Sequence, residues 1–410
     1  MGLFLNTLVA IAYTAVVLGS IFAASSVSLS LIYGTMRFLN LAHGSFLVIG
    51  GYVAWVFAHY LGLPLYLAIV FATGFGLALG LFTYFIMLKP KVFVTRRWPK
   101  IAEENLKKKF DVTLNEDDKP LSNSELAEAF YRNDALAPTV SDIIDETIIK
   151  KGRQGKGRII SNFGVGINHI DIQACKNFDI TLTNTPDVLT DATADLTMLL
   201  MLMTSRRSRE GENEIRTGNW TGWRPTHLLG NQLKHKTLGI IGMGRIGQAV
   251  AKRAAIAFGM KIKFYNRSKI NKNFNFEASQ VPNIMDLCKS SDFISLHCPG
   301  GINNKHIINY RALSAMKKSA FLINTARGDL LDEDALCKAL TEKLIAGAGL
   351  DVFENEPNIN LSLLNAPNLV LLPHLGSATL ETRNAMGNRV LDNLKQFFDN
   401  EIPTNQIQFS

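Results

Sequence analysis

The distribution of charge divides this chain into two unlike parts. From Met1 to Leu88 the only Lys or Arg is Arg37, and the first acidic residue of the whole chain is Glu103. Apolar stretches occupy residues 3–33, 45–61 and 63–88, and each reaches the roughly 17–25 residues that a helix needs to cross a bilayer. They have no polar face and no basic leader, which argues against buried soluble helices and against a signal peptide. We therefore expect an all-α transmembrane segment over residues 1–88.

The few charges of this segment predict its orientation. Arg37 and the basic group at residues 89–97 flank different spans, and with three spans both fall on the same side of the bilayer. Positive residues favour the cytoplasmic side. The remainder of the chain is therefore expected in the cytoplasm, tethered to the inner membrane by the contact of residues 1–88 with lipid.

A short motif relates this segment to transporters. The stretch at residues 33–46, followed by Gly50-Gly51-Tyr52-Val53-Ala54, resembles the start of a branched-chain amino-acid ABC transporter permease. The resemblance covers only residues 1–88, which is short of a whole permease, so transport by this chain alone is not expected. Residue 88 runs into a β-rich stretch without a linker, and Met87 offers a second start. A fused or mis-joined reading frame is therefore the alternative to a working membrane segment.

The composition of residues 89–410 is that of an ordinary soluble chain. All but one of the 43 Lys and Arg residues fall there, together with all 35 Asp and Glu residues. No basic tract with interleaved aromatic residues occurs, so nucleic acid is not an expected partner. The cysteines are far apart and form no metal-binding pattern, so we expect reduced thiols and no metal site; they are Cys175, Cys288, Cys298 and Cys337.

Short β-rich runs alternate with amphipathic runs throughout residues 89–410. Each β-rich run ends in Gly, Pro or Asn or close to one, and most are apolar enough to be buried on both faces of a parallel sheet. The alternation predicts an α/β fold built from doubly wound units. The predicted strands include residues 92–95, 158–162, 237–241, 261–265, 293–297, 321–324, 346–352 and 369–372.

A glycine-rich turn follows one of these strands and opens a predicted helix. This is the setting in which a GxGxxG pattern indicates dinucleotide binding. Gly242 permits the tight turn, Gly244 lets the backbone approach a pyrophosphate, and Gly247 allows close packing of helix on strand. The helix N-terminus supplies amide donors to the phosphates. The full turn reads Gly242-Met243-Gly244-Arg245-Ile246-Gly247.

The residues after the next strand favour one nicotinamide cofactor over the other. An NAD site usually has an acidic residue there for the ribose 2′-hydroxyl, whereas this chain has Asn266, Arg267 and Ser268. The guanidinium of Arg267 can bind a 2′-phosphate, with Ser268 as a further donor. We therefore expect NADP(H), with NAD(H) as the alternative.

Three polar residues follow three predicted strands, at the edge of the sheet where ligands of open α/β proteins bind. They are Arg327, Glu356 and His374. Delivery of a hydride to C2 of a 2-oxo acid leaves negative charge on oxygen, and histidine is the natural proton donor near neutral pH. A carboxylate can fix the imidazole ring, and a guanidinium can grip the substrate carboxylate. His297 also ends a strand and is the second candidate for the acid.

The motifs together resemble the D-isomer-specific 2-hydroxyacid dehydrogenases, with glyoxylate/hydroxypyruvate reductase as the nearest subgroup. The resemblance spans residues 89–410 and rests on the glycine turn and on the segments at residues 324–328, 350–357 and 373–377. It implies two Rossmann-like or flavodoxin-like domains. A substrate-binding domain would comprise residues 89–186 and 375–410, and a dinucleotide-binding domain residues 187–374.

The resemblance also implies roles for individual residues. Arg327, Glu356 and His374 would be catalytic, with His374 as general acid in the reduction of glyoxylate or hydroxypyruvate to the D-2-hydroxy acid. Thr193, Pro299, Thr325 and Asp351 would contact the cofactor in addition to the glycine turn. Trp223 would reach the active site of a partner subunit, which suggests a homodimer. The substrate would lie against Val140, Gly164, Val165 and Gly166.

Other functions stay open at this point. Glu356 stands where formate dehydrogenases have Gln, and D-lactate dehydrogenases usually keep the acidic residue that is absent at Asn266. A nucleotide-sensing binding protein could use the same fold, but it would not need the Arg, Glu and His set. A transporter component is suggested only by residues 1–88.

Overall fold

The computed structural model of the chain describes residues 89–270 and 273–409, and within residues 1–88 only scattered positions between 52 and 75. The chain divides into two compact units, Met1–Leu88 and Lys89–Ser410. The three apolar stretches predicted to cross a membrane lie almost wholly outside the described residues. Among the residues that are described, no helix combines the length and the apolar character needed to span a bilayer.

The first sheet of Lys89–Ser410 has five parallel strands in the order β2-β1-β3-β4-β5. Its residues alternate between two apolar cores: Val92 and Val94 face α4 and α15, while Leu136 and Ile160 face α5, α6 and α7. The strands are β1 (Lys91–Val94), β2 (Asp111–Leu114), β3 (Ala135–Ala137), β4 (Ile159–Ser161) and β5 (Thr181–Thr183). The helices are α4 (Lys100–Lys109), α5 (Asn123–Arg132), α6 (Glu146–Gln154), α7 (Ile172–Asn177) and α15 (Leu380–Phe398).

The second sheet has seven parallel strands in the order β12-β11-β10-β9-β6-β7-β8. Its strands are β6 (Thr237–Ile241), β7 (Lys261–Tyr265), β8 (Ala278–Gln280), β9 (Phe293–Leu296), β10 (Phe321–Asn324), β11 (Gly347–Leu350) and β12 (Leu369–Leu371). The associated helices are α8 (Thr190–Ser205), α9 (Ser208–Arg216), α10 (Arg245–Phe258), α11 (Ile284–Ser290), α12 (Tyr310–Ala315), α13 (Glu333–Thr341) and α14 (Leu361–Asn365). The prediction of doubly wound parallel α/β units is confirmed.

Helices cover both faces of this second sheet, as its buried strands require. Apolar side chains of α8 and α10 form one core with Leu238, Ile240 and Phe321, and those of α11, α12 and α13 form the other with Leu322 and Leu350. Short side chains at the helix starts satisfy free backbone amides; examples are the capping box of Ser122 with Glu125 and the caps at Asp332 and Thr379.

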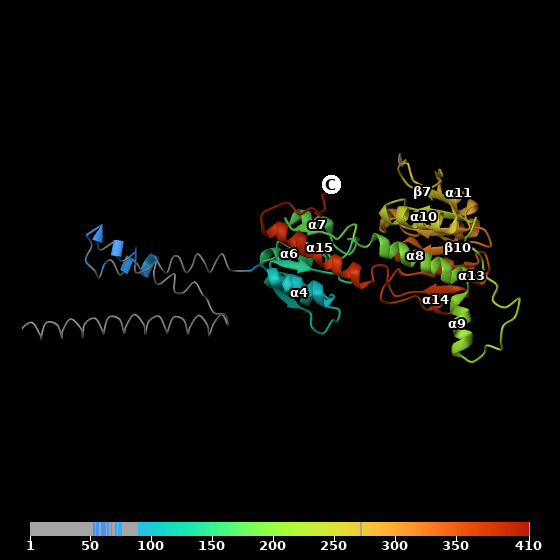
Figure 1. Cartoon of the computed structure of the whole chain (residues 1–410), viewed down its shortest axis with the longest axis horizontal. Coiled ribbons are helices and arrows are strands. Elements are labelled where there is room, and N and C mark those ends of the chain that lie inside the picture. Colours follow the sequence, from blue (N-terminus) through green and yellow to red (C-terminus); the bar gives the residue numbers. More distant parts are fainter. Residues whose placement is uncertain are drawn as a thin grey trace, which may run out of the picture. The chain divides into compact units, whose positions relative to one another are not determined.

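The C-terminal helix returns to the first sheet. Met386, Val390 and Leu394 of α15 belong to the same core as Val92 and Trp98, although nearly 300 residues separate them. Figure 1 shows α15 in red, and it packs against the cyan helix α4. The predicted domain limits at residues 186/187 and 374/375 stay predictions, because Lys89–Ser410 forms one compact unit.

Candidate active site

The glycine turn between β6 and α10 is shaped by close contacts. Gly242 has a φ of 95°, and a Cβ there would lie 2.6 Å from the backbone nitrogen of Cys298. A Cβ at Gly247 would overlap the carbonyl oxygen of Gly242, whereas one at Gly244 would enter open space. Gly244 precedes the first residue of α10, and no side chain caps this helix start. Open space in front of uncapped amides fits the pyrophosphate of a dinucleotide.

The other residues predicted to surround the cofactor lie near this turn or in the neighbouring pocket. Asn266 donates a hydrogen bond of 3.3 Å to the hydroxyl of Ser268. The positive charge of Arg267 acts on the thiol of Cys298, although burial dominates there and raises the thiol pKa to about 11. The Nε of Arg245 lies 2.6 Å from a carboxylate oxygen of exposed Asp187.

Asp351 is buried and supports the turn that carries the histidine. Its carboxylate accepts hydrogen bonds from the amides of Leu375 (2.7 Å) and Gly376 (2.8 Å). Burial raises its pKa to about 6 despite these donors. Thr193 donates to the carbonyl oxygen of Gly376 (3.1 Å), and the hydroxyl of Thr325 lies 2.9 Å from that of Thr197. In this structure Asp351 and Thr193 therefore hold the turn at residues 374–376, and their expected contacts with the cofactor remain predictions.

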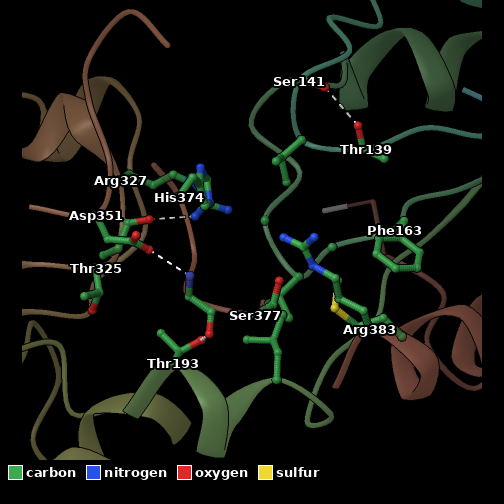
Figure 2. A pocket seen from close by; sticks show the side chains of 18 of the residues that line it. Thr139, Ser141, Phe163, Thr193, Thr325, Arg327, Asp351, His374, Ser377 and Arg383 are labelled. Atoms are coloured by element: carbon green, nitrogen blue, oxygen red, sulfur yellow. Dashed lines mark hydrogen bonds between the residues drawn. The ribbon is translucent and has the colours of Figure 1, made fainter. Parts of the chain in front are cut away.

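The three side chains predicted to be catalytic line one pocket of about 860 Å³. Nδ1 of His374 lies 2.7 Å from Oε2 of Glu356, and the other oxygen of Glu356 accepts the amide of Phe353 at 2.8 Å. Burial opposes ionisation of Glu356, but these partners and the charge of Arg327 lower its pKa overall. Figure 2 shows Arg327 and His374 close together on the same wall as Asp351.

Arg327 touches the loop predicted to bind the substrate carboxylate. A Cβ at Gly166 would overlap its guanidinium, so a larger residue there would displace the side chain of Arg327. Burial lowers the pKa of Arg327 against the raising effect of Glu356 and Asp329. Its Nη1 donates to the carbonyl oxygen of Ala326 at 2.6 Å. The pocket also contains Val140, Gly164, Val165, Ile246, Pro299 and Thr325.

Two further predicted residues lie apart from this set. Trp223 is 82% exposed and is not among the described residues that line this pocket, so its role in the active site of a partner subunit stays a prediction. His297, the second candidate for the proton donor, is wrong for that role. It lines the pocket, but burial lowers its pKa to about 3. Its Nε2 lies 2.8 Å from the hydroxyl of Ser295. Its Nδ1 is buried without a partner among the described residues. A ring held neutral in this way cannot serve as an acid near neutral pH.

Sequence reasoning missed the residues that shape the substrate loop. The side-chain amide of buried Asn162 donates to the carbonyl oxygens of Gly164 and Gly166, both at 3.0 Å. Its oxygen lies 3.0 Å from Nε2 of His169, whose pKa falls to about 4 through burial and the charge of Arg327. The available signal was the position of Asn162, since it directly follows a strand and precedes a glycine-rich loop.

The fold and the glycine turn define a dinucleotide-binding α/β oxidoreductase. The sequence profile described as the NAD binding domain of D-isomer specific 2-hydroxyacid dehydrogenases matches residues 198–376. The chain is 44% identical over 324 residues to a glyoxylate reductase of Thermococcus litoralis, which covers 78% of this chain and 97% of the relative. A glyoxylate reductase of Pyrococcus horikoshii is 43% identical, with 77% and 95% covered. The chain therefore belongs to the D-isomer specific 2-hydroxyacid dehydrogenase family, as its motifs predicted.

Solved structures show the same fold. A 2-hydroxyacid dehydrogenase from a Polaromonas species is similar with a TM-score of 0.74 at 37% identity, covering 78% of this chain and 100% of the other. An NADPH-dependent glyoxylate/hydroxypyruvate reductase of Sinorhizobium meliloti, solved with NADP and malonate, has a TM-score of 0.69 at 33% identity, covering 78% and 97%. A profile of the branched-chain amino acid transport system permease component matches residues 11–93, in agreement with the resemblance of the N-terminal motif.

Proposed function

We propose that this chain reduces a small 2-oxo acid, glyoxylate or hydroxypyruvate, to the D-2-hydroxy acid at the expense of a nicotinamide cofactor. The observation that carries the proposal is the 2.7 Å hydrogen bond between Glu356 and His374 in the pocket that Arg327 also lines. The names of the relatives, glyoxylate reductase, support this choice of substrate.

Each of the three side chains has its own part in the proposed reaction. A nicotinamide held along the glycine turn would supply the hydride for C2 of the substrate, and negative charge would then develop on the ketone oxygen. Glu356 engages Nδ1 of His374, which leaves Nε2 to deliver a proton to that oxygen. The guanidinium of Arg327 binds the substrate carboxylate and polarises the ketone. Amides of residues 164–166 complete the carboxylate site, with Val140 at its border.

The cofactor is proposed to lie along the glycine turn and to be NADPH in preference to NADH. The turn at residues 242–247 would hold the pyrophosphate, and Thr193, Pro299, Thr325 and Asp351 would border the remainder. Arg267 is the natural partner for a 2′-phosphate, since no carboxylate stands in the turn at residues 266–269 to repel that group. Replacing Arg267 with Leu should raise the KM for NADPH more than that for NADH. Equal kcat/KM values with both cofactors for the unaltered chain would contradict the preference.

Trp223 is proposed to complete the active site of a second copy of the chain. Its exposed indole lies between α9 and β6, in a stretch without helix or strand. Large exposed aromatic side chains are typical of protein interfaces. Light scattering after size exclusion should give the mass of a dimer, and Trp223→Ala should raise the KM for hydroxypyruvate. A monomer with full activity would rule this arrangement out.

The catalytic part is further proposed to work in the cytoplasm, with residues 1–88 as a membrane tether. The permease profile over residues 11–93 and the near absence of charge before residue 89 support the tether.

The central experiment is a substrate panel on the purified full chain. Glyoxylate, hydroxypyruvate, pyruvate and longer 2-oxo acids are each offered with NADPH and with NADH, and cofactor oxidation is followed by absorbance. We expect turnover with at least one of the first two acids. Tight NADPH binding without oxidation by any acid would favour a nucleotide-sensing binding protein instead.

A further inference from the structure

The pocket contains a guanidinium that the proposed reaction does not use. Arg383 of α15 lines the pocket, and its side chain makes no hydrogen bond or ion pair with any described residue. Figure 2 shows it extending into the pocket from the side opposite Arg327 and His374. Arg383 therefore enters the pocket from α15, which packs on the first sheet, and Arg327 enters it from the loop after β10.

The carboxylates around this pocket are already engaged. Among the described residues that line it, Asp118 pairs with Arg96 at 2.9 Å, Asp351 accepts two backbone amides, and Glu356 is bonded to His374. The neighbouring Arg97 pairs with Glu103 at 2.8 Å. No carboxylate of the described pocket wall is thus left to neutralise Arg383, and an anion from solution can do so.

The place of Arg383 on its helix also favours an anion. It is the fourth residue of α15, a helix of 19 residues whose first turn contains Glu381. The positive end of the helix dipole disfavours a cation there unless an anion is bound. Arg383 is exposed, and its guanidinium has no partner among the described residues, so it is free to bind an anion in the pocket.

A second donor without an acceptor lies in the same wall. Trp98 packs against α15, where a Cβ on Gly387 would lie 3.4 Å from its ring. Its side chain is buried and lines the pocket, and its indole N–H has no acceptor among the described residues. Buried donors without acceptors are uncommon in folded proteins, but this N–H is closed to solvent, so the inference rests on Arg383.

We propose that Arg383 binds a second carboxylate, so that the pocket accepts 2-oxo dicarboxylic acids of four or five carbons. Arg327 would hold the carboxylate next to the ketone and Arg383 the distal one. The reaction is that of the proposed function, on which this inference rests: hydride to C2 and a proton to its oxygen give the 2-hydroxy diacid and the oxidised cofactor. Glyoxylate has a single carboxylate and would use only the first arginine.

A matched pair of substrates isolates the distal group. Oxaloacetate and 2-oxobutanoate both have four carbons and differ in the second carboxylate, so their kcat/KM ratio is measured on the full chain with NADPH. We expect a preference for the diacid of about 10–100-fold, the usual value of a hydrogen bond to a charged group. Arg383→Met should bring the ratio to within about twofold of unity, because the charge–carboxylate interaction is lost.

The control is Arg389→Met, which removes a charge from the same helix outside the described lining of this pocket. It should leave the ratio unchanged, and thermal unfolding should show both variants folded. If neither four-carbon acid is reduced, succinate and butanoate are compared as inhibitors of glyoxylate reduction. These two acids also differ in the second carboxylate, so the ratio of their inhibition constants tests the same interaction. An unaltered chain that does not prefer the diacid, or an Arg383→Met chain that keeps the preference, overturns this inference alone. Failure to reduce any 2-oxo acid overturns the proposed function as well.

Discussion

His374 occupies a backbone conformation that few residues adopt. Its φ is 55°, and its amide donates to the carbonyl oxygen of Asp351 at 2.9 Å. The left-handed region is unfavourable for most L-residues, although Asn, Asp and His enter it several times more often than the others. The surrounding hydrogen bonds from Leu375 and Gly376 to Asp351 hold this turn in place.

Replacing His374 with Asn tests the general acid without disturbing this turn. Asparagine tolerates the same backbone but cannot deliver a proton, so we expect turnover of glyoxylate to fall by a factor on the order of 10²–10⁴. Thermal unfolding should shift little. Steady-state rates measured beside circular dichroism melts provide the check, and unchanged turnover would remove His374 from the proposed role.

His297 gives the folded chain a defined sensitivity to acid. Its pKa is about 3 in the folded state, against 6.5 for a free histidine, because it is buried as the neutral ring. The unfolded chain binds the extra proton, so this contribution to stability is complete above pH 6.5 and is lost as the pH falls toward 3. Urea unfolding at pH 7.5 and pH 5 should show the loss.

The control for this pH effect is His297→Gln, which keeps a side-chain amide for Ser295 but does not titrate. The loss of stability between the two pH values should be smaller in this variant. His169, whose pKa is about 4, contributes in the same direction and remains in both proteins. An equal loss in the variant and the unaltered chain would show that His297 is not responsible.

At the scale of the site, residues that follow strands could be predicted and residues that act through others could not. Arg327, Glu356 and His374 each follow a strand in the sequence, and parallel strands bring such residues to one edge. Asn162 also follows a strand, but its residue type gave no sign of a role in the site, and Arg383 gave no signal of either kind. The first acts through its hydrogen bonds to a loop, and the second depends on the return of α15 to the first sheet, which no local pattern reveals.

At the scale of secondary structure, strands with a continuous apolar run were easier to predict than exposed ones. β6, β9, β10 and β11 are buried along nearly their whole length, which produces a clear apolar run. β2 and β8 lie at the edges of their sheets with several exposed residues. Their pairing with a neighbouring strand defines them, and that information is not local.

The glycine turn between β6 and α10 allows a paired test of two positions. Gly242→Ala should destabilise the fold by roughly 1–3 kcal/mol, since alanine is strained at a φ of 95° and would press on Cys298. Gly244→Ala meets open space, so it should fold normally and weaken dinucleotide binding, because its methyl group would occupy the space proposed for the pyrophosphate. Thermal melts and NADPH fluorescence titrations separate the two effects. Equal melting temperatures for the two variants would contradict the expected strain at Gly242. An NADPH affinity of Gly244→Ala equal to that of the unaltered chain would contradict the expected role of Gly244 in binding.

At the scale of the whole chain, the sharp change in composition at residue 88 coincides with the division into two compact units. Two glyoxylate reductases match this chain over 324 and 323 residues, which is 97% and 95% of their own length. The similarity therefore spans nearly the whole of both relatives.

A chain that begins at Met87 tests the role of the preceding segment. We expect it to reduce glyoxylate with the same kcat/KM as the full chain, because the described site contains no residue before Arg96. The full chain should sediment with membranes and be released by detergent but not by high salt, whereas the shorter chain should stay in the supernatant. A full-length chain that does not sediment, or a native N-terminal peptide that starts at Met87, would refute the tether.

The left-handed turn at His374 has a consequence for how this position can change over evolutionary time. The positive φ at position 374 restricts which amino acids can occupy it, whatever their chemistry. Among the amino acids that tolerate this φ, only histidine has a side chain that exchanges protons near neutral pH. Lineages that lose the activity should therefore drift at this codon toward asparagine, aspartate or glycine and rarely toward β-branched residues.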